Sequence, residues 1–224
     1  MPVFGGSKNN PRYVAARKKY LGQQIKWVGN RKILLPRPPW DTEDSSLRRV
    51  SNRLGFDIST WVKKRNRKTQ QPVVVLDWGC GPGTAITTLV QENPEIVTGI
   101  GFSDIAYNEM NENPHVRFIQ NTADKLFRYR FMKPNSLDLI FSHFGLHHFQ
   151  TTLFGKTFDQ KEYRKYILAL ARCLKPGGIL VTTNAHQIPD NVKAWKLATG
   201  EKITGFKFLI RGGRATLVVR KKEK

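Results

Sequence analysis

The sequence has few cysteines and no long apolar run, and both absences restrict what the protein can be. Cys80 and Cys173 lie far apart and form no Cys-x-x-Cys pair, so neither a disulfide framework nor a zinc site is expected. No run of about 18 apolar residues is present, which argues against a membrane span. The start of the chain also lacks the apolar core of a signal peptide. We therefore expect a soluble, metal-free protein of a reducing compartment, the cytoplasm by default.

Acidic residues are scarce at both ends of the chain. Residues 1–72 hold 17 Lys and Arg against 4 Asp and Glu, and residues 188–224 hold 10 against 3. Residues 73–187 are nearly balanced, with 11 against 10, although the whole chain has a formal net charge of +21. Basic ends favour a polyanionic partner, because Lys and Arg release counterions from phosphates. RNA is the partner that we expect at these ends. A solubilising surface, or a transit segment at the start, is the alternative.

The chain changes character after Pro72, where apolar, β-branched runs begin to alternate with helical patterns. This alternation predicts a doubly wound α/β fold with a seven-stranded, mostly parallel sheet that ends in a C-terminal antiparallel hairpin. We expect residues 73–224 to form this domain and residues 1–72 to be a basic, partly helical extension that binds the substrate or covers the cleft. The expected strands are residues 73–76, 96–100, 116–119, 137–142 and 179–183, with a hairpin over 205–219. The expected helices are residues 45–54, 58–65, 84–93, 104–113 and 159–174.

A glycine-rich turn comes after the first strand of this domain and precedes a helix. It reads Leu76-Asp77-Trp78-Gly79-Cys80-Gly81-Pro82-Gly83. Glycines permit a tight turn and a close approach of a ligand to the backbone, but nucleotide-binding folds of other kinds also have such a turn. The spacing here is Gly-x-Gly-x-Gly, and an acid stands two residues before the first glycine. This arrangement suits a ligand with a cationic amino-acid end better than a pyrophosphate.

Residues 73–219 resemble the class I (Rossmann-like) methyltransferases in three motifs that occur in the family's order. They are the glycine turn, the segment Leu137–Phe149, and Leu174-Lys175-Pro176-Gly177-Gly178 before the fifth strand. The resemblance implies that S-adenosylmethionine is the cofactor. It implies that Asp77 organises the turn and the methionine amino group, and that the backbone around Cys80 packs on the cofactor. The remaining cofactor-binding candidates that we take from it are Gly79, Gly81, Gly83, Phe102, Asp104, Asp124 (for the adenine amino group), Ser142 and His143.

One position departs from the family pattern. The second strand of these enzymes usually ends in an acid that binds both ribose hydroxyls, whereas this chain has Gly101 there. Asp104, three residues later, either reaches the ribose from a rearranged turn or caps the next helix. The departure leaves open a non-catalytic RNA-binding or assembly factor that keeps the methyltransferase fold.

The segment after the fourth strand indicates the class of acceptor. Ser142-His143-Phe144-Gly145 stands where enzymes that methylate amino groups carry Asn/Asp-Pro-Pro-aromatic, which argues against that subclass. His147 and His148 come next, and either can bind an acceptor or remove a proton from it. We therefore predict a methyltransferase of RNA (cap, ribosomal or transfer RNA), with a small molecule or protein as the alternative acceptor. Aromatic residues among the basic residues of 1–72 suit stacking on unpaired bases; they are Tyr13, Tyr20, Trp27, Trp40 and Trp61.

Overall fold

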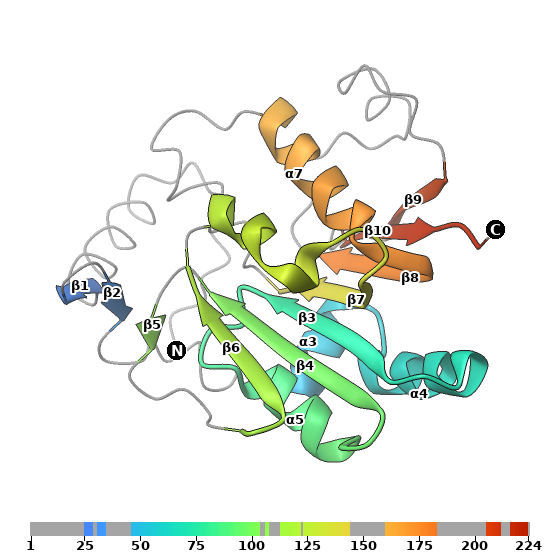
Figure 1. Ribbon diagram of the computed structural model, residues 1–224, viewed down its shortest axis with the longest axis horizontal. Helices are drawn as coiled ribbons and strands as arrows, with labels where there is room; N and C mark the ends of the chain where they lie inside the picture. Colours follow the sequence, from blue (N-terminus) through green and yellow to red (C-terminus); the bar gives the residue numbers. More distant parts are fainter. Residues whose placement is uncertain are drawn as a thin grey trace.

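The predicted α/β fold is confirmed by the computed structural model, which describes residues 25–28, 31–34, 46–103, 106–107, 113–121, 123–143, 160–182, 205–211 and 216–223 (Figure 1). Seven strands form the main sheet in the order β6-β4-β3-β7-β8-β10-β9. The first five strands of this order are parallel, and β10 is antiparallel to both β8 and β9. Their bounds are β3 Val73–Trp78, β4 Val97–Ser103, β6 Val116–Gln120, β7 Leu137–Ser142, β8 Leu174–Thr182, β9 Phe206–Arg211 and β10 Thr216–Lys221.

The strands form because short apolar runs can be buried on both faces of the sheet. In β3, Val73 and Val75 point into one hydrophobic cluster, whereas Leu76 and Trp78 belong to the other. The two clusters lie on opposite faces of the sheet, as the two-residue period of a strand requires. The domain is therefore a three-layer structure with a core on each side of the sheet.

Helices cover both faces of the sheet. One face carries α3 (Leu47–Leu54), α4 (Ile58–Thr69) and α5 (Thr84–Glu92), which pack in the cluster that contains Val73. The other face carries α7 (Gln160–Arg172) and two short 3-10 helices, η1 (Ala123–Arg128) and η2 (Arg130–Met132), on the near side in Figure 1. Helices α3 and α4 precede residue 72 and yet share a core with the sheet. The change at residue 72 is thus a change of charge and not of packing.

A second, small sheet was not expected from the sequence. Its strands are β1 (Ile25–Val28), β2 (Arg31–Leu34) and β5 (Ala106–Tyr107), in that order. β1 and β2 pair antiparallel, and β5 joins β2 in parallel. The predicted helix over 104–113 is therefore wrong at residues 106–107. Pairing with a distant strand overrides the local helical pattern there.

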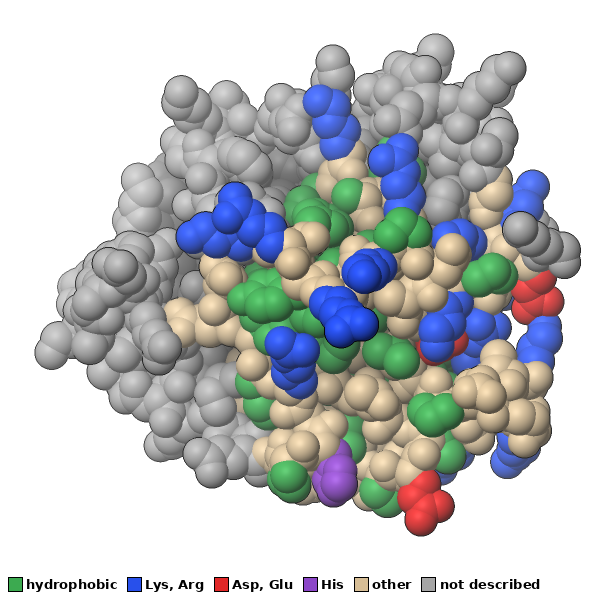
Figure 2. Space-filling model, viewed as in Figure 1, with side chains coloured by type: hydrophobic (Ala, Val, Ile, Leu, Met, Phe, Trp, Pro, Cys, Tyr) green, Lys and Arg blue, Asp and Glu red, His purple; other side chains and the backbone are tan. Residues whose placement is uncertain are grey.

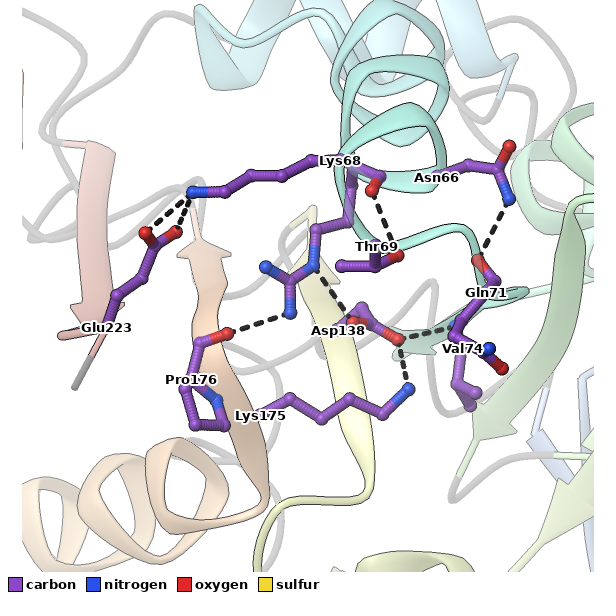
Figure 3. A network of polar contacts seen from close by, with 10 residues as sticks. Asn66, Lys68, Thr69, Gln71, Val74, Asp138, Lys175, Pro176 and Glu223 are labelled. Atoms are coloured by element: carbon purple, nitrogen blue, oxygen red, sulfur yellow. Dashed lines mark hydrogen bonds and ion pairs between the residues drawn. The ribbon is translucent and has the colours of Figure 1, made fainter.

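A buried network of ion pairs and hydrogen bonds fixes the amino end of β7, at the edge of the sheet away from the glycine turn (Figure 3). The Asp138 carboxylate accepts hydrogen bonds from Arg65 Nε at 3.1 Å, from Lys175 Nζ at 2.6 Å and from the Val74 amide at 3.0 Å. Arg65 also donates to the carbonyl oxygen of Pro176 at 2.8 Å. This network ties α4 to three strands of the sheet.

Candidate cofactor site

The glycine turn joins the carboxyl end of β3 to α5. Gly79, Gly81 and Gly83 have positive φ angles of 78°, 56° and 83°, a region that residues with a Cβ rarely adopt. The amides of Gly79 and Cys80 donate to the carbonyl oxygen of Phe102 at 2.8 and 3.0 Å, which ties the turn to the end of β4. Phe102 is itself fully buried, so it holds the turn from the core side.

The amino end of α5 opens directly onto this turn. Its N-cap is Gly83, which has no side chain to accept a hydrogen bond from the first helical amides. A Cβ at Gly83 would fall closer to the Phe118 ring than two carbon atoms can approach. We call this turn with its three glycines the backbone cradle; at Gly83 the Phe118 ring packs directly against it.

Asp77 is a buried carboxylate beside the cradle. Its residue is only 4 % exposed, and burial raises the pKa of this carboxyl group well above its ordinary value. Among the described residues, no hydrogen bond or ion pair of this carboxylate is found to offset its desolvation. A buried charge is costly until it is paired. The position is therefore suited to the cationic group of a ligand.

Phe118 covers the end of β4, where the sequence has Gly101. In the register of the sheet, Gly101 lies between Asp77 on one side and Phe118 on the other. A Cβ built on Gly101 would lie 2.6 Å from Phe118 Cδ1 and 3.1 Å from Cys80 Sγ. The ring therefore occupies the space that an acidic side chain would need. Phe118 was not expected from the sequence to belong to the site, although its place opposite Gly101 in the next strand was a usable signal.

The end of β7 places the next two candidates at the same edge of the sheet. Ser142 is fully buried opposite Thr182 of β8. His143 is half-buried, and its Nε2 lies 3.3 Å from Nη1 of Arg53 in α3. Because a guanidinium only donates, Nε2 accepts, and the ring proton lies on Nδ1. Nothing local in the sequence could have indicated Arg53, because 90 residues separate it from His143.

Several predicted site residues lie outside the described part of the structure. Asp104, His147 and His148 are among them. Asp124 stands in η1, directly after β6, but its side chain is not described. The roles given to these four residues stay predictions.

The two thiols are poor nucleophiles in this fold. Burial, followed by the charge of nearby Asp77, raises the pKa of the Cys80 thiol well above its ordinary value. Burial raises the pKa of Cys173 to about 11. Both thiols are therefore protonated at neutral pH, and reaction through a thiolate is disfavoured.

The described residues indicate neither a metal centre nor a membrane helix. No three His, Cys, Asp or Glu side chains among them are placed to share a metal ion. Within the same residues, no helix is long and apolar enough to cross a membrane. A hollow of about 450 Å³ lies between α3 and α5, beside Ser51 and Asp57, but it shares no residue with the glycine turn. The turn remains the candidate site because its chemistry, and not the size of a hollow, identifies it.

The arrangement of a glycine cradle, a buried acid and a helix amino end at the carboxyl edge of a parallel sheet has a counterpart among known families. Residues 76–182 match the sequence model of the methyltransferase domain family. This segment of the chain is thus similar to the methyltransferase domain family. The match begins at the last residues of β3 and ends with β8, so this domain includes the whole glycine turn and the end of β7.

Solved structures of methyltransferases are similar to this chain at low sequence identity. The plantazolicin methyltransferase BpumL is 13% identical, with a TM-score of 0.51, over 83% of this chain and 87% of its own. A TehB-like methyltransferase from Corynebacterium glutamicum is 17% identical, with a TM-score of 0.44, over 79% and 94%. A ribosomal RNA methyltransferase, putative, from Plasmodium falciparum is 15% identical, with a TM-score of 0.41, over 74% and 95%. No curated protein matches the sequence.

The residues of the methyltransferase domain fit the cofactor of the family, S-adenosylmethionine. The methionine end of this molecule carries an ammonium group, which the buried Asp77 carboxylate would hold. Gly79, Gly81 and Gly83 carry no side chains, so a ligand can approach the backbone of the turn at these residues. The ribose side differs from the family pattern, because Phe118 stands where a carboxylate would bind the hydroxyls.

We expect an acidic side chain at residue 101 to be tolerated only if the Phe118 side chain is shortened. Gly101→Asp alone should destabilise the protein by about 1–3 kcal/mol, as overpacking does, and should weaken the binding of S-adenosylhomocysteine. Adding Phe118→Ala to Gly101→Asp should recover most of the lost affinity. The double variant should bind S-adenosylhomocysteine more tightly than Phe118→Ala alone. Thermal unfolding and calorimetric titration measure both effects. Wild-type stability in the single Gly101→Asp variant would contradict the steric argument.

Proposed function

We propose that this methyltransferase domain transfers a methyl group to RNA. The observation that carries the proposal is the charge distribution, because the balanced central unit is flanked by ends with 17 Lys and Arg against 4 Asp and Glu, and 10 against 3. A small apolar acceptor would need no such ends. A phosphate backbone gains affinity from each Lys or Arg that displaces a counterion.

At the carboxyl edge of the sheet, some residues bind the cofactor and others position side chains near the acceptor. When bound, S-adenosylmethionine supplies an electrophilic methyl group. Asp77 orients the methionine end through its carboxylate, and the amides at the start of α5 face the same cradle. Arg53 holds the ring of His143 at the end of β7. Placing the acceptor atom in line with the methyl group lowers the barrier chiefly through orientation.

The acceptor atom would be met by the segment after β7. His147 and His148 are the proposed acceptor-binding residues, and either can take the proton that an N–H or O–H acceptor loses on methylation. A ring nitrogen that already has a free lone pair needs no base, so positioning alone would be enough. The absence of an Asn/Asp-Pro-Pro-aromatic motif after residue 141 supports such an acceptor over an exocyclic amine.

The test is transfer of tritium from labelled S-adenosylmethionine into total RNA by the full chain. We expect label in RNA with the wild-type protein and none with Asp77→Asn, which keeps the side-chain shape but removes the charge. Nuclease digestion of the labelled RNA then identifies the nucleotide. Label that enters protein or small molecules instead would contradict the RNA proposal. Cofactor binding without any transfer would favour the non-catalytic RNA-binding factor.

A further inference from the structure

Most of the Lys and Arg residues of the nearly balanced central part of the chain, residues 73–187, belong to elements on one side of the domain. We call this face the η face; it consists of β6, η1, η2 with Lys133 after it, and α7. Residues 123–133 include four Lys or Arg and one acid, and α7 includes four and one. With Arg117 of β6, these elements hold nine of the eleven Lys and Arg of residues 73–187. The near neutrality of this part of the sequence therefore conceals a strong local excess of positive charge.

Five cations of the η face that the structure describes are open to solvent. None of the five forms an ion pair with another described residue; they are Arg117, Lys125, Arg128, Arg130 and Lys133. The exposed carboxylates that the structure describes lie elsewhere. Asp57, Glu92 and Glu95 belong to the α3–α5 side, and Glu223 pairs with Lys68. Figure 2 shows blue side chains spread around a green, apolar centre on this face.

Stacked planar groups stand among these cations. The rings of Tyr129 and Phe131 lie 5.6 Å apart between centroids, with an interplanar angle of 26°. The Arg117 guanidinium lies over the Phe131 ring, with its Cζ 5.8 Å from the centroid. The hydroxyl of Tyr129 accepts a hydrogen bond from Asn121 Nδ2 at 2.8 Å, which fixes the ring. Fixed rings and guanidinium planes between cations are the groups on which unpaired bases stack.

The η face leads to the cofactor edge of the sheet. η1 begins directly after β6 ends at Gln120, at the same edge as the glycine turn, because β6, β4 and β3 are parallel. The chain then returns along the face through η2 to the start of β7 at Leu137. A strand bound along these residues would therefore have one end at the site of methyl transfer.

We infer that the η face binds single-stranded RNA, with Lys125, Arg128, Arg130 and Lys133 on its phosphates and the Arg117–Phe131 stack against a base. The inference rests on RNA being the acceptor in the proposed function. It assigns the binding of the acceptor strand to the folded domain, in addition to the basic ends of the chain. Stacked, half-buried rings suit flat bases, whereas they offer no projecting apolar side chain for a lipid surface.

The experiment compares two triple variants of the full chain with the same change in charge. Arg128→Gln, Arg130→Gln and Lys133→Gln neutralise the η face, whereas Lys63→Gln, Lys64→Gln and Arg67→Gln neutralise exposed cations of α4 on the other side of the sheet. Affinity for a short labelled single-stranded RNA is measured over a series of salt concentrations, without cofactor. The η-face triple should bind about tenfold more weakly or worse, and its salt slope should be smaller by about 2, at about 0.7 per lost phosphate contact. The α4 triple removes three cations of the basic N-terminal end, so it should lose some affinity, but clearly less than the η-face triple.

The outcomes separate this inference from the proposed function. Equal losses in the two triples, or no loss in the η-face triple, would overturn the assignment of the η face. A loss confined to duplex RNA would overturn it too, because stacking requires unpaired bases. Methyl transfer into RNA with an unchanged KM in the η-face triple would leave the proposed function intact and remove this inference. If the η-face triple selectively loses RNA binding while even the wild-type protein transfers no methyl group to RNA, this inference stands and the proposed function falls.

Discussion

Asp77→Asn is expected to lose cofactor binding and, at neutral pH, to make the ligand-free protein more stable. The carboxylate is buried and, among the described residues, unpaired, so its charge opposes folding until a ligand cation arrives. Losing the partner of a buried charge typically costs about 2–5 kcal/mol of binding free energy, or about 30- to 5000-fold in affinity. Calorimetric titration with S-adenosylmethionine and thermal unfolding without it measure the two effects. Tight binding by the variant would remove Asp77 from the site.

The pH dependence of this stability difference has a definite sign. The pKa of Asp77 is higher in the folded protein than its ordinary value of 3.8, so the folded state holds the proton more tightly and loses stability as the pH rises above about 3.8. The stability of Asp77→Asn relative to wild type should therefore increase as the pH rises, until the pH exceeds the pKa of Asp77 in the folded protein. Asp57→Asn is the control, because hydrogen bonds from the backbone and hydroxyl of Thr60 lower the pKa of the exposed Asp57. Asp57→Asn should be less stable than wild type, and this stability difference should shrink as the pH falls. Its cofactor binding should be unchanged.

Asp138→Asn is expected to be the most destabilising of the single substitutions considered. The amide would turn an N–H₂ group toward donors that now share two carboxylate oxygens, and it would leave Arg65 without its buried counter-charge. The side chains of Arg65 and Asp138 are only 9% and 3% exposed. Breaking a buried pair of this kind typically costs about 3–5 kcal/mol. Denaturant titration measures the loss.

A nearby ion pair provides the control for Asp138. Lys68 and Glu223 also join α4 to the C-terminal part of the chain, but their side chains are 58% and 55% exposed. Solvent screening makes such a pair contribute little to stability, so Lys68→Gln should unfold close to wild type. Arg65→Gln combined with Asp138→Asn removes both buried charges and should recover part of the loss. Equal stability of Asp138→Asn and Lys68→Gln would show that the buried network contributes no more than the exposed pair.

The main sheet could be predicted because its strands have local signals in the sequence. Val73–Leu76 and Leu137–Ser142 are apolar runs of strand length, and the structure places strands on both. The small sheet could not be predicted in this way. β5 is two residues long, and it is a strand only because residues 33 and 34 lie beside it. Its sequence carries no signal of that distant pairing.

The candidate site likewise has features that the sequence predicted and others that only the folded chain shows. The glycine turn is contiguous, so its residues alone predicted a tight turn whose backbone a ligand can approach, and the structure adds the positive φ angles. The burial of Asp77, the contact of Arg53 with His143 and the place of the Phe118 ring depend on segments that meet only in the folded chain. From the sequence, Gly101 indicated only a missing acid. The structure adds that a neighbouring strand has filled the space.

The packing of α3 and α4 has a consequence for anyone who wishes to transplant this catalytic unit into a chimaeric enzyme. A fragment cut at the change of charge near residue 72 would strip the sheet of two helices, and Val50, Leu54, Ile58 and Val62 would no longer shield the apolar face beneath them. Such a fragment would expose an aggregation-prone surface and lose the arginine that steadies His143. The smallest portable unit that the packing supports therefore starts no later than Ser46, the N-cap of α3.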